Sequence, residues 1–145
     1  MDKYITIQST DSIDLYPDNK PWSFRVQLNE HLYFEKQCTI ALTDITIQNW
    51  NVNKRTDCHD IYIYTSICYP SHVGESKEPL LRRICLRGSK KQRHFNFPQN
   101  YYIPLKVQNF QTLDLYIKTS NGDSASFISE PVTVTLHLKL LPFWI

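Results

Sequence analysis

The sequence predicts one all-β domain that spans residues 1–145 and folds as a two-sheet sandwich. Apolar and polar residues alternate in many short runs, which is the periodicity of half-buried strands. Aromatic residues make up 13% of the chain and favour strands, because flat side chains pack well on a pleated surface. No segment has sustained helical periodicity. Strands without helices in one domain indicate a sandwich or a barrel, and we expect the sandwich.

About eight runs are predicted to form antiparallel strands. They lie near residues 3–8, 22–28, 37–48, 60–68, 81–87, 93–97, 112–118 and 131–141. In the second run the even positions, from Trp22 to Leu28, are apolar and share one face. The run from Ile61 to Ile67 is apolar or aromatic at most positions, as expected of a strand covered on both sides.

The apolar pattern changes phase in the run 37–48. Ile40 and Leu42 occupy even positions, whereas Ile45 and Ile47 occupy odd positions. A bulge or bend near Asp44 would re-aim the later side chains and allow the strand to pass from one sheet region to another.

The last two runs are predicted to pair with each other. Leu113 to Ile117 alternates with polar residues, and so does the run from Val132 to Leu140. Between them, Asn121-Gly122 favours a type I′ turn, in which both residues have positive φ. We therefore expect Leu136 to point inward, and Thr135 and His137 to lie on the tolerant outer face.

Cysteine use and the chain start predict a reducing, intracellular environment. The residues after Met1 do not form the apolar core of a signal peptide, and no segment is long enough to span a membrane. Without a secretory signal, all four cysteines are expected as free thiols. Cys38, Cys68 and Cys85 lie within strand-like runs, where free cysteine behaves as a small buried apolar residue.

The sequence gives no basis for catalysis, a metal site or a cofactor. No His is followed two residues later by His, Asp or Glu, the spacing that would let alternate strand positions share a metal. Asp57, Cys58, His59 and Asp60 are adjacent, but no second ligand pair has finger-like spacing, so a polar loop is expected. No nucleophile elbow or phosphate-binding glycine loop is present.

A basic cluster surrounds the predicted Gly88-Ser89 turn. It comprises Arg82, Arg83, Arg87, Lys90, Lys91 and Arg93, followed by His94. Such an edge could contact nucleic acid or an acidic partner. Alternatively, it is a solvated hairpin whose charges discourage aggregation between strand edges. The net charge of +2 is too small to decide between these hypotheses.

The C-terminal residues are unusually apolar. Phe143, Trp144 and Ile145 follow Leu140-Leu-Pro, whereas chain ends are usually polar. This tail is expected either to pack against its own sandwich or to dock on a neighbouring subunit.

Several segments, taken in order, carry a resemblance to a known family. They are a Tyr-Pro-Asp-Asn turn with its following strand (13–28), an Ala-Leu-Thr-Asp-Ile strand end (38–45), a Val-Gly-Glu segment ending in Leu-Leu-Arg (73–82), a Pro-Gln-Asn-Tyr-Tyr-Ile-Pro-Leu segment (97–105) and the closing strands (110–138). Together they resemble the penton (minor capsid) proteins of Maverick/polinton elements and adintoviruses. The connection between Asp44 and Val73 is shorter here than in that family.

The resemblance implies a single jelly-roll β-sandwich and a structural role at the five-fold vertices of an icosahedral capsid. It implies a homopentamer, a major capsid protein as partner, and location in the virion after intracellular assembly, in the host nucleus. A contact with nucleic acid through the basic cluster is a further expectation.

A cellular β-sandwich interaction module is the alternative. An immunoglobulin-like core would need a Cys, Trp, Cys order on inward strands, yet Trp50 follows the Cys38 strand in a polar segment. The aspartate-rich loops of a C2-like module are also missing.

Overall fold

The computed structural model describes residues 2–48, 60–86 and 94–141, and the secondary structure of these residues is all β. The strands are β1 (Asp2–Gln8), β2 (Ser23–Tyr33), β3 (Cys38–Ile47), β4 (Asp60–Tyr64), β5 (Ser71–Val73), β6 (Ser76–Glu78), β7 (Leu80–Cys85), β8 (His94–Asn96), β9 (Ile103–Pro104), β10 (Asn109–Thr119) and β11 (Val132–Leu140).

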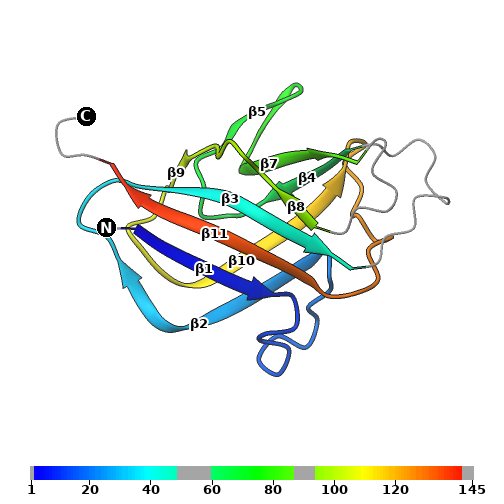
Figure 1. Cartoon of the computed structure of the whole chain (residues 1–145), viewed down its shortest axis with the longest axis horizontal. Coiled ribbons are helices and arrows are strands. Elements are labelled where there is room, and N and C mark those ends of the chain that lie inside the picture. Colours follow the sequence, from blue (N-terminus) through cyan, green and yellow to red (C-terminus); the bar gives the residue numbers. More distant parts are fainter. Residues whose placement is uncertain (1, 49–59, 87–93, 142–145) are drawn as a thin grey trace.

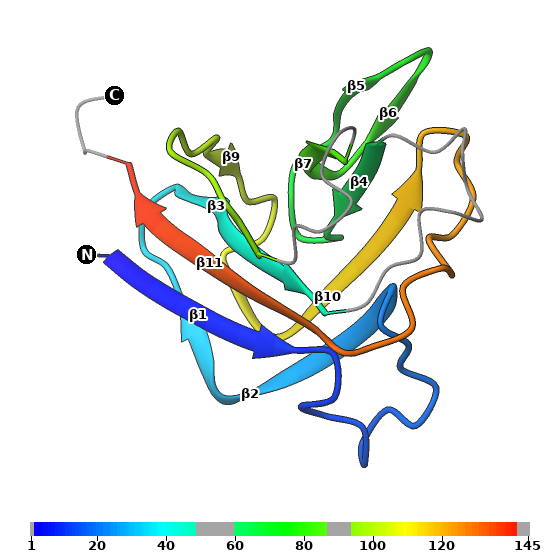
Figure 2. The same ribbon diagram turned by 45° about the vertical axis from the view of Figure 1, so that its right-hand side comes forward.

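The strands form two antiparallel sheets that pack face to face (Figure 1). The first sheet has the order β1-β11-β3, and both β8 and β9 pair with the far edge of β3. The second sheet has the order β2-β10-β4-β7. Consecutive strands mostly alternate between the sheets, which is the topology of a jelly roll and confirms the predicted fold class. The β5–β6 hairpin projects away from the sandwich (Figure 2).

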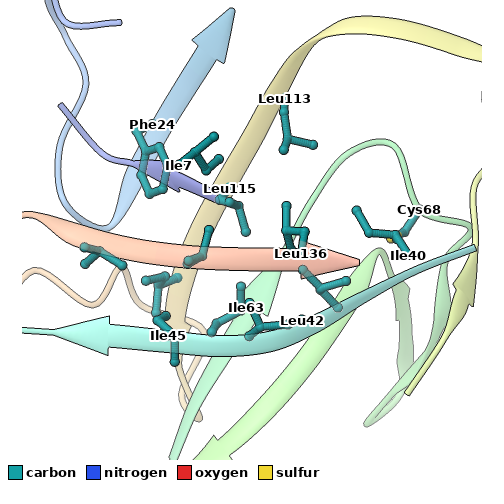
Figure 3. Packing of buried hydrophobic residues seen from close by; sticks show 14 of the residues in the cluster. Ile7, Phe24, Ile40, Leu42, Ile45, Ile63, Cys68, Leu113, Leu115 and Leu136 are labelled. Atoms are coloured by element: carbon teal, nitrogen blue, oxygen red, sulfur yellow. The ribbon is translucent and has the colours of Figure 1, made fainter. Parts of the chain in front are cut away.

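The core lies between the sheets and is made of the inward positions of each strand. The predicted inward faces of β2 and β11 are confirmed: Phe24, Val26, Val134 and Leu136 are buried. They meet buried side chains from β3, β4 and β10, which include Ile40, Leu42, Ile45, Ile63, Leu113 and Leu115 (Figure 3). Alternation of period two therefore decides which residues form the core.

The predicted bulge in β3 is present beside Asp44. Thr135 of β11 pairs with Asp44, but the next residue, Leu136, pairs with Leu42, so Thr43 is the extra residue. Its hydroxyl donates a hydrogen bond to the carbonyl of Thr135, with an oxygen–oxygen distance of 3.0 Å. The bulge keeps Leu42 and Ile45 on the inner face. The strand stays in one sheet and pairs with β9 before the bulge and with β8 after it.

The predicted pairing of the last two strands is wrong, because β10 and β11 lie in opposite sheets. The turn at Asn121-Gly122 folds residues 123–125 back onto the end of β10: Thr119 N–H donates to the carbonyl of Asp123, and Ala125 N–H donates to that of Ile117. The predicted type I′ geometry is also wrong. Gly122 has φ +87°, but no described residue other than glycine has positive φ.

Two further expectations are corrected at single residues. Cys38 and Cys68 are buried as predicted, but Cys85 is exposed, because it pairs with Asp60 on the outer side of β4 and β7. His137 does point outward, yet its exposed fraction is only 6% because aromatic side chains cover it. Strands β5, β6 and β9 were not predicted, and β4 ends at Tyr64, before the predicted end of its run.

Candidate functional site

The two described members of the basic cluster, Arg82 and Arg83, lie on opposite faces of β7. In the regular part of the β4–β7 ladder, Ile63 pairs with Arg82 and Tyr62 pairs with Arg83. Since Ile63 points into the core, Arg82 lies on the inner side of the strand and Arg83 on the outer side. The remaining members, Arg87, Lys90, Lys91 and Arg93, lie outside the described residues, so a shared basic edge stays a prediction.

Arg83 is part of an exposed ion pair on the outer face of the second sheet. Its Nη1 lies 2.7 Å from Oδ2 of Asp60, on the neighbouring strand β4. This hydrogen bond and the negative charge of Asp60 raise the pKa of Arg83. Because the arginine side chain is exposed, the pair contributes little to stability.

Arg82 is held between two aromatic rings from the opposite sheet edge. Its guanidinium carbon lies 3.8 Å from the centre of the Phe97 ring and 4.4 Å from that of Tyr101. Its Nη1 donates to the carbonyl of Gln99 over 2.9 Å. Its Nε is buried and has no hydrogen-bond partner among the described residues. Burial lowers the pKa of Arg82, but an arginine remains charged.

A groove of about 510 Å³ runs beside Arg82, between β7 and the β8–β9 segment. Apolar side chains make up most of its walls: Leu80, Ile84, Phe95, Phe97, Tyr101 and Ile103. Ser71, Leu81, Arg83 and Cys85 complete the lining. The groove therefore combines an apolar surface with the positive charge of Arg82, which the two aromatic rings hold in place.

The outer face of the first sheet carries an aromatic cluster around His137. The Tyr4 ring stacks on the imidazole at 4.3 Å between centres, and the Tyr102 hydroxyl is hydrogen-bonded to Nδ1 over 2.7 Å. Lys139 Nζ lies 5.3 Å from the Tyr102 ring centre. Tyr4 remains 66% exposed, so its other face is available to a neighbouring surface.

The outer face of the second sheet has its own aromatic pair. Tyr64 and Tyr116 stack at 5.1 Å between ring centres, and Lys118 Nζ lies within 6 Å of both. Burial, followed by nearby negative charges that include Glu78, raises the pKa of both tyrosines. Each sheet therefore presents tyrosine and lysine side chains outward, an amphipathic surface suited to protein contacts.

No catalytic or metal-binding arrangement emerges from the described residues. No group of three or more His, Cys, Asp or Glu side chains in these residues could hold a metal ion. The adjacent Asp57, Cys58 and His59 lie outside the described residues. Burial raises the pKa of Cys38 to about 11 and that of Cys68 to about 12, so neither thiol is a ready nucleophile.

The prediction for the apolar C-terminal tail falls on residues that the structure does not describe. Phe143, Trp144 and Ile145 lie outside the described residues, so the docking of the apolar tail stays a prediction. In the described part of the chain, no helix has the length and apolar character needed to cross a membrane.

Comparison with known proteins finds likeness in structure and none in sequence. No protein-family model and no curated protein matches the chain. The crystal structure of the selenomethionine-labelled mavirus penton protein superposes with a TM-score of 0.64 and 6% identity, covering 97% of this chain and 100% of that one. A Drosophila NLP-core structure, described for pentamer formation and histone binding, has a TM-score of 0.38, 9% identity and coverage of 94% and 95%. The second value is too low to support any conclusion. The first shows that the two chains share the jelly-roll fold.

Proposed function

We propose that this chain is a penton protein, a minor capsid protein that forms the five-fold vertices of an icosahedral capsid. The end-to-end structural match to the mavirus penton protein carries the proposal, because it includes the whole of that chain. A fold alone does not determine function. The order of the sequence motifs that resemble polinton and adintovirus pentons supports the same role independently of the match.

The surface chemistry suits a protein that works by contact with copies of itself and with other capsid subunits. Tyr4, Tyr33, Tyr69 and Tyr101 are large exposed side chains on the described surface. Tyrosine is enriched at protein interfaces because it buries a large apolar ring and keeps a polar hydroxyl. The proposed partners are four further copies of this chain and a major capsid protein, and the proposed location is the virion.

Electron microscopy combined with light scattering tests the proposal. The purified chain is examined alone and after co-expression with the major capsid protein from the same genome. Five-fold rings, or capsids whose vertices carry density for this chain, are the expected result. A monomer at all concentrations that is also missing from the capsids contradicts the proposal and favours a cellular interaction module.

A further inference from the structure

The groove beside β7 has the features of a binding site for an extended peptide. β7 is an edge strand: within the described residues it is hydrogen-bonded to β4 alone. Among the residues that the structure describes, its backbone N–H and C=O groups on the side away from β4 have no hydrogen-bond partner. An exposed strand edge is a template on which another strand can add.

The corresponding edge of β2, in the same sheet, is protected. The side chain of Asn19 accepts a hydrogen bond from Arg25 N–H over 3.0 Å and donates one to its carbonyl over 2.8 Å. Two residues further on, Gln27 N–H donates to the hydroxyl of Ser12 over 3.0 Å. These side chains occupy the positions that a neighbouring strand would take. No described side chain makes such bonds to the outer edge of β7.

Arg82 supplies the charge that such a peptide would meet. It points toward the inner side of the groove, and Phe97 and Tyr101 fix the plane of its guanidinium. It forms no ion pair within the described residues, whereas Arg83 is paired with Asp60, and Lys3 of the edge strand β1 with Glu30. A planar guanidinium held in place is suited to a bidentate carboxylate.

We propose that this groove binds an extended segment of a partner protein, which adds as a strand to β7 and places an acidic side chain against Arg82. Side chains alternate along a strand, so the residues flanking the acid on the same face would contact the apolar walls of the groove. The preferred ligand is therefore an acidic residue among apolar residues at alternate positions. This site does not depend on the capsid role, because it uses only the edge, the groove and Arg82.

A random octapeptide library displayed on phage tests the site. The full-length protein is the bait, and enriched peptides are then synthesised and their affinities measured by fluorescence polarisation. We expect an acid flanked by alternating apolar residues. Arg82→Met should weaken binding of these peptides by at least about tenfold, because it leaves the carboxylate unpaired. Arg25→Gln is the matched control, since it removes the same charge from an exposed residue of β2 that does not line the groove, and it should change the affinity by less than about twofold.

Hydrogen exchange locates the bound peptide. Addition of the peptide should slow exchange at the β7 amides of the unmodified protein and leave the protected edge of β2 unchanged. If Arg82→Met does not fold, two other measurements replace it. One is the affinity of the peptides for the Arg82→Lys protein, and the other is the affinity of the unmodified protein for a peptide whose acidic residue is changed to its amide. Both changes should reduce the affinity.

Several outcomes overturn the proposal. One is a selection that enriches no peptides with an acid flanked by alternating apolar residues. A second is equal affinity of the peptides for Arg82→Met and the unmodified protein. A third is slowed hydrogen exchange at amides outside β7. If no peptide binds but Arg82→Met dissociates an oligomer in light scattering, the groove holds a second copy of this chain. In that case the partner-protein site is rejected.

Discussion

At the scale of single residues, His137 shows how an outward-facing polar side chain becomes part of the packed structure. Tyr4 covers one face of its ring, and Tyr102 holds Nδ1 from the β8–β9 segment. Both partners come from other strands or loops, so the histidine links β1, β11 and the segment before β9. Its removal would disturb three parts of the first sheet at once.

His137→Ala should therefore cost about 1–3 kcal/mol of unfolding free energy, because a ring contact and a hydrogen bond are lost. Tyr102→Phe should cost about 1 kcal/mol, because only the hydrogen bond is removed. Leu136→Ala, which leaves a cavity in the core, should cost about 2–5 kcal/mol. Urea denaturation measures all three. Thr133→Ala, on the outer face of the same strand, is the control and should cost less than about 1 kcal/mol. A His137→Ala cost equal to that control would show that the cluster is not stabilising.

Alkaline pH should reveal the burial of Cys68. Its folded pKa is raised to about 12 from the ordinary value of 9.0, mainly by desolvation. Above pH 9 the unfolded chain releases this proton while the folded chain retains it, so folding stability falls as pH rises toward 12. The slope for one such group is about 1.4 kcal/mol per pH unit.

The measurement compares the unfolding free energy of Cys68→Ala with that of the unmodified protein from pH 7 to pH 11. The stability difference between the two proteins should be constant below pH 8 and shift in favour of the variant above pH 9. The raised pKa values of Tyr64 and Tyr116 affect both proteins equally. A stability difference that stays constant up to pH 11 would contradict the burial of the thiol.

Sequence patterns predicted residue environments only where those environments depend on strand periodicity. The inward positions of Val134 and Leu136 were predicted in this way. The burial of His137 was not, because its cover comes from Tyr4 and Tyr102, which are distant in sequence. Arg82 was grouped with Arg83 because they are adjacent in sequence, but consecutive residues of a strand point to opposite faces, so the two side chains lie on opposite sides of β7.

At the scale of elements, the bulge at Thr43 allows β3 to serve as the central strand of its sheet. Leu42, before the bulge, and Ile45, after it, both point into the core. They are three residues apart, so in an uninterrupted strand they would point to opposite faces. The phase change of apolar residues was enough to predict this feature.

Deletion of Thr43 should leave the domain folded, because it removes the extra residue and Ile40, Leu42, Ile45 and Ile47 would then follow one uninterrupted alternation on the inner face. Thr43→Val is the matched control: it keeps the bulge and loses only the hydrogen bond to Thr135, so it should cost about 1 kcal/mol. Circular dichroism and urea denaturation distinguish the two outcomes. An unfolded deletion variant would mean that β3 needs the bulge itself, and that inward alternation of its apolar residues is not enough to fix the pairing of β3 with β11.

Strand pairing was the part of the fold that local patterns did not predict. The Asn121-Gly122 turn is present, but it returns residues 123–125 to the end of β10, and β11 crosses to the other sheet. A two-residue turn predicts only that the chain reverses direction locally. The packing of both sheets decides which strand the next long strand pairs with. The short strands β5, β6 and β9 have too few alternating residues to be recognised from sequence.

At the scale of the whole molecule, the sandwich is built from pairs that are distant in sequence. β11 pairs with both β1 and β3, and β10 pairs with both β2 and β4. Such pairing requires large loops to close before their contacts form, which slows folding.

We therefore expect the isolated domain to refold in milliseconds to seconds, as other non-local β-sandwiches do. Stopped-flow tryptophan fluorescence after dilution from urea gives the rate. Leu136→Ala should speed unfolding or slow refolding, depending on whether β11 docks before or after the rate-limiting step. Refolding in microseconds would contradict the non-local topology.

The pairing of the first strand with the last also determines how the domain responds to force. β1 and β11 are antiparallel, so Asp2 lies opposite Lys139 and the start of β1 lies beside the end of β11 (Figure 1). A pull that separates the ends would load the hydrogen bonds between these strands one pair at a time, beginning at Asp2 and Lys139. Opening in this zipper geometry needs less force than shearing all the pairs together.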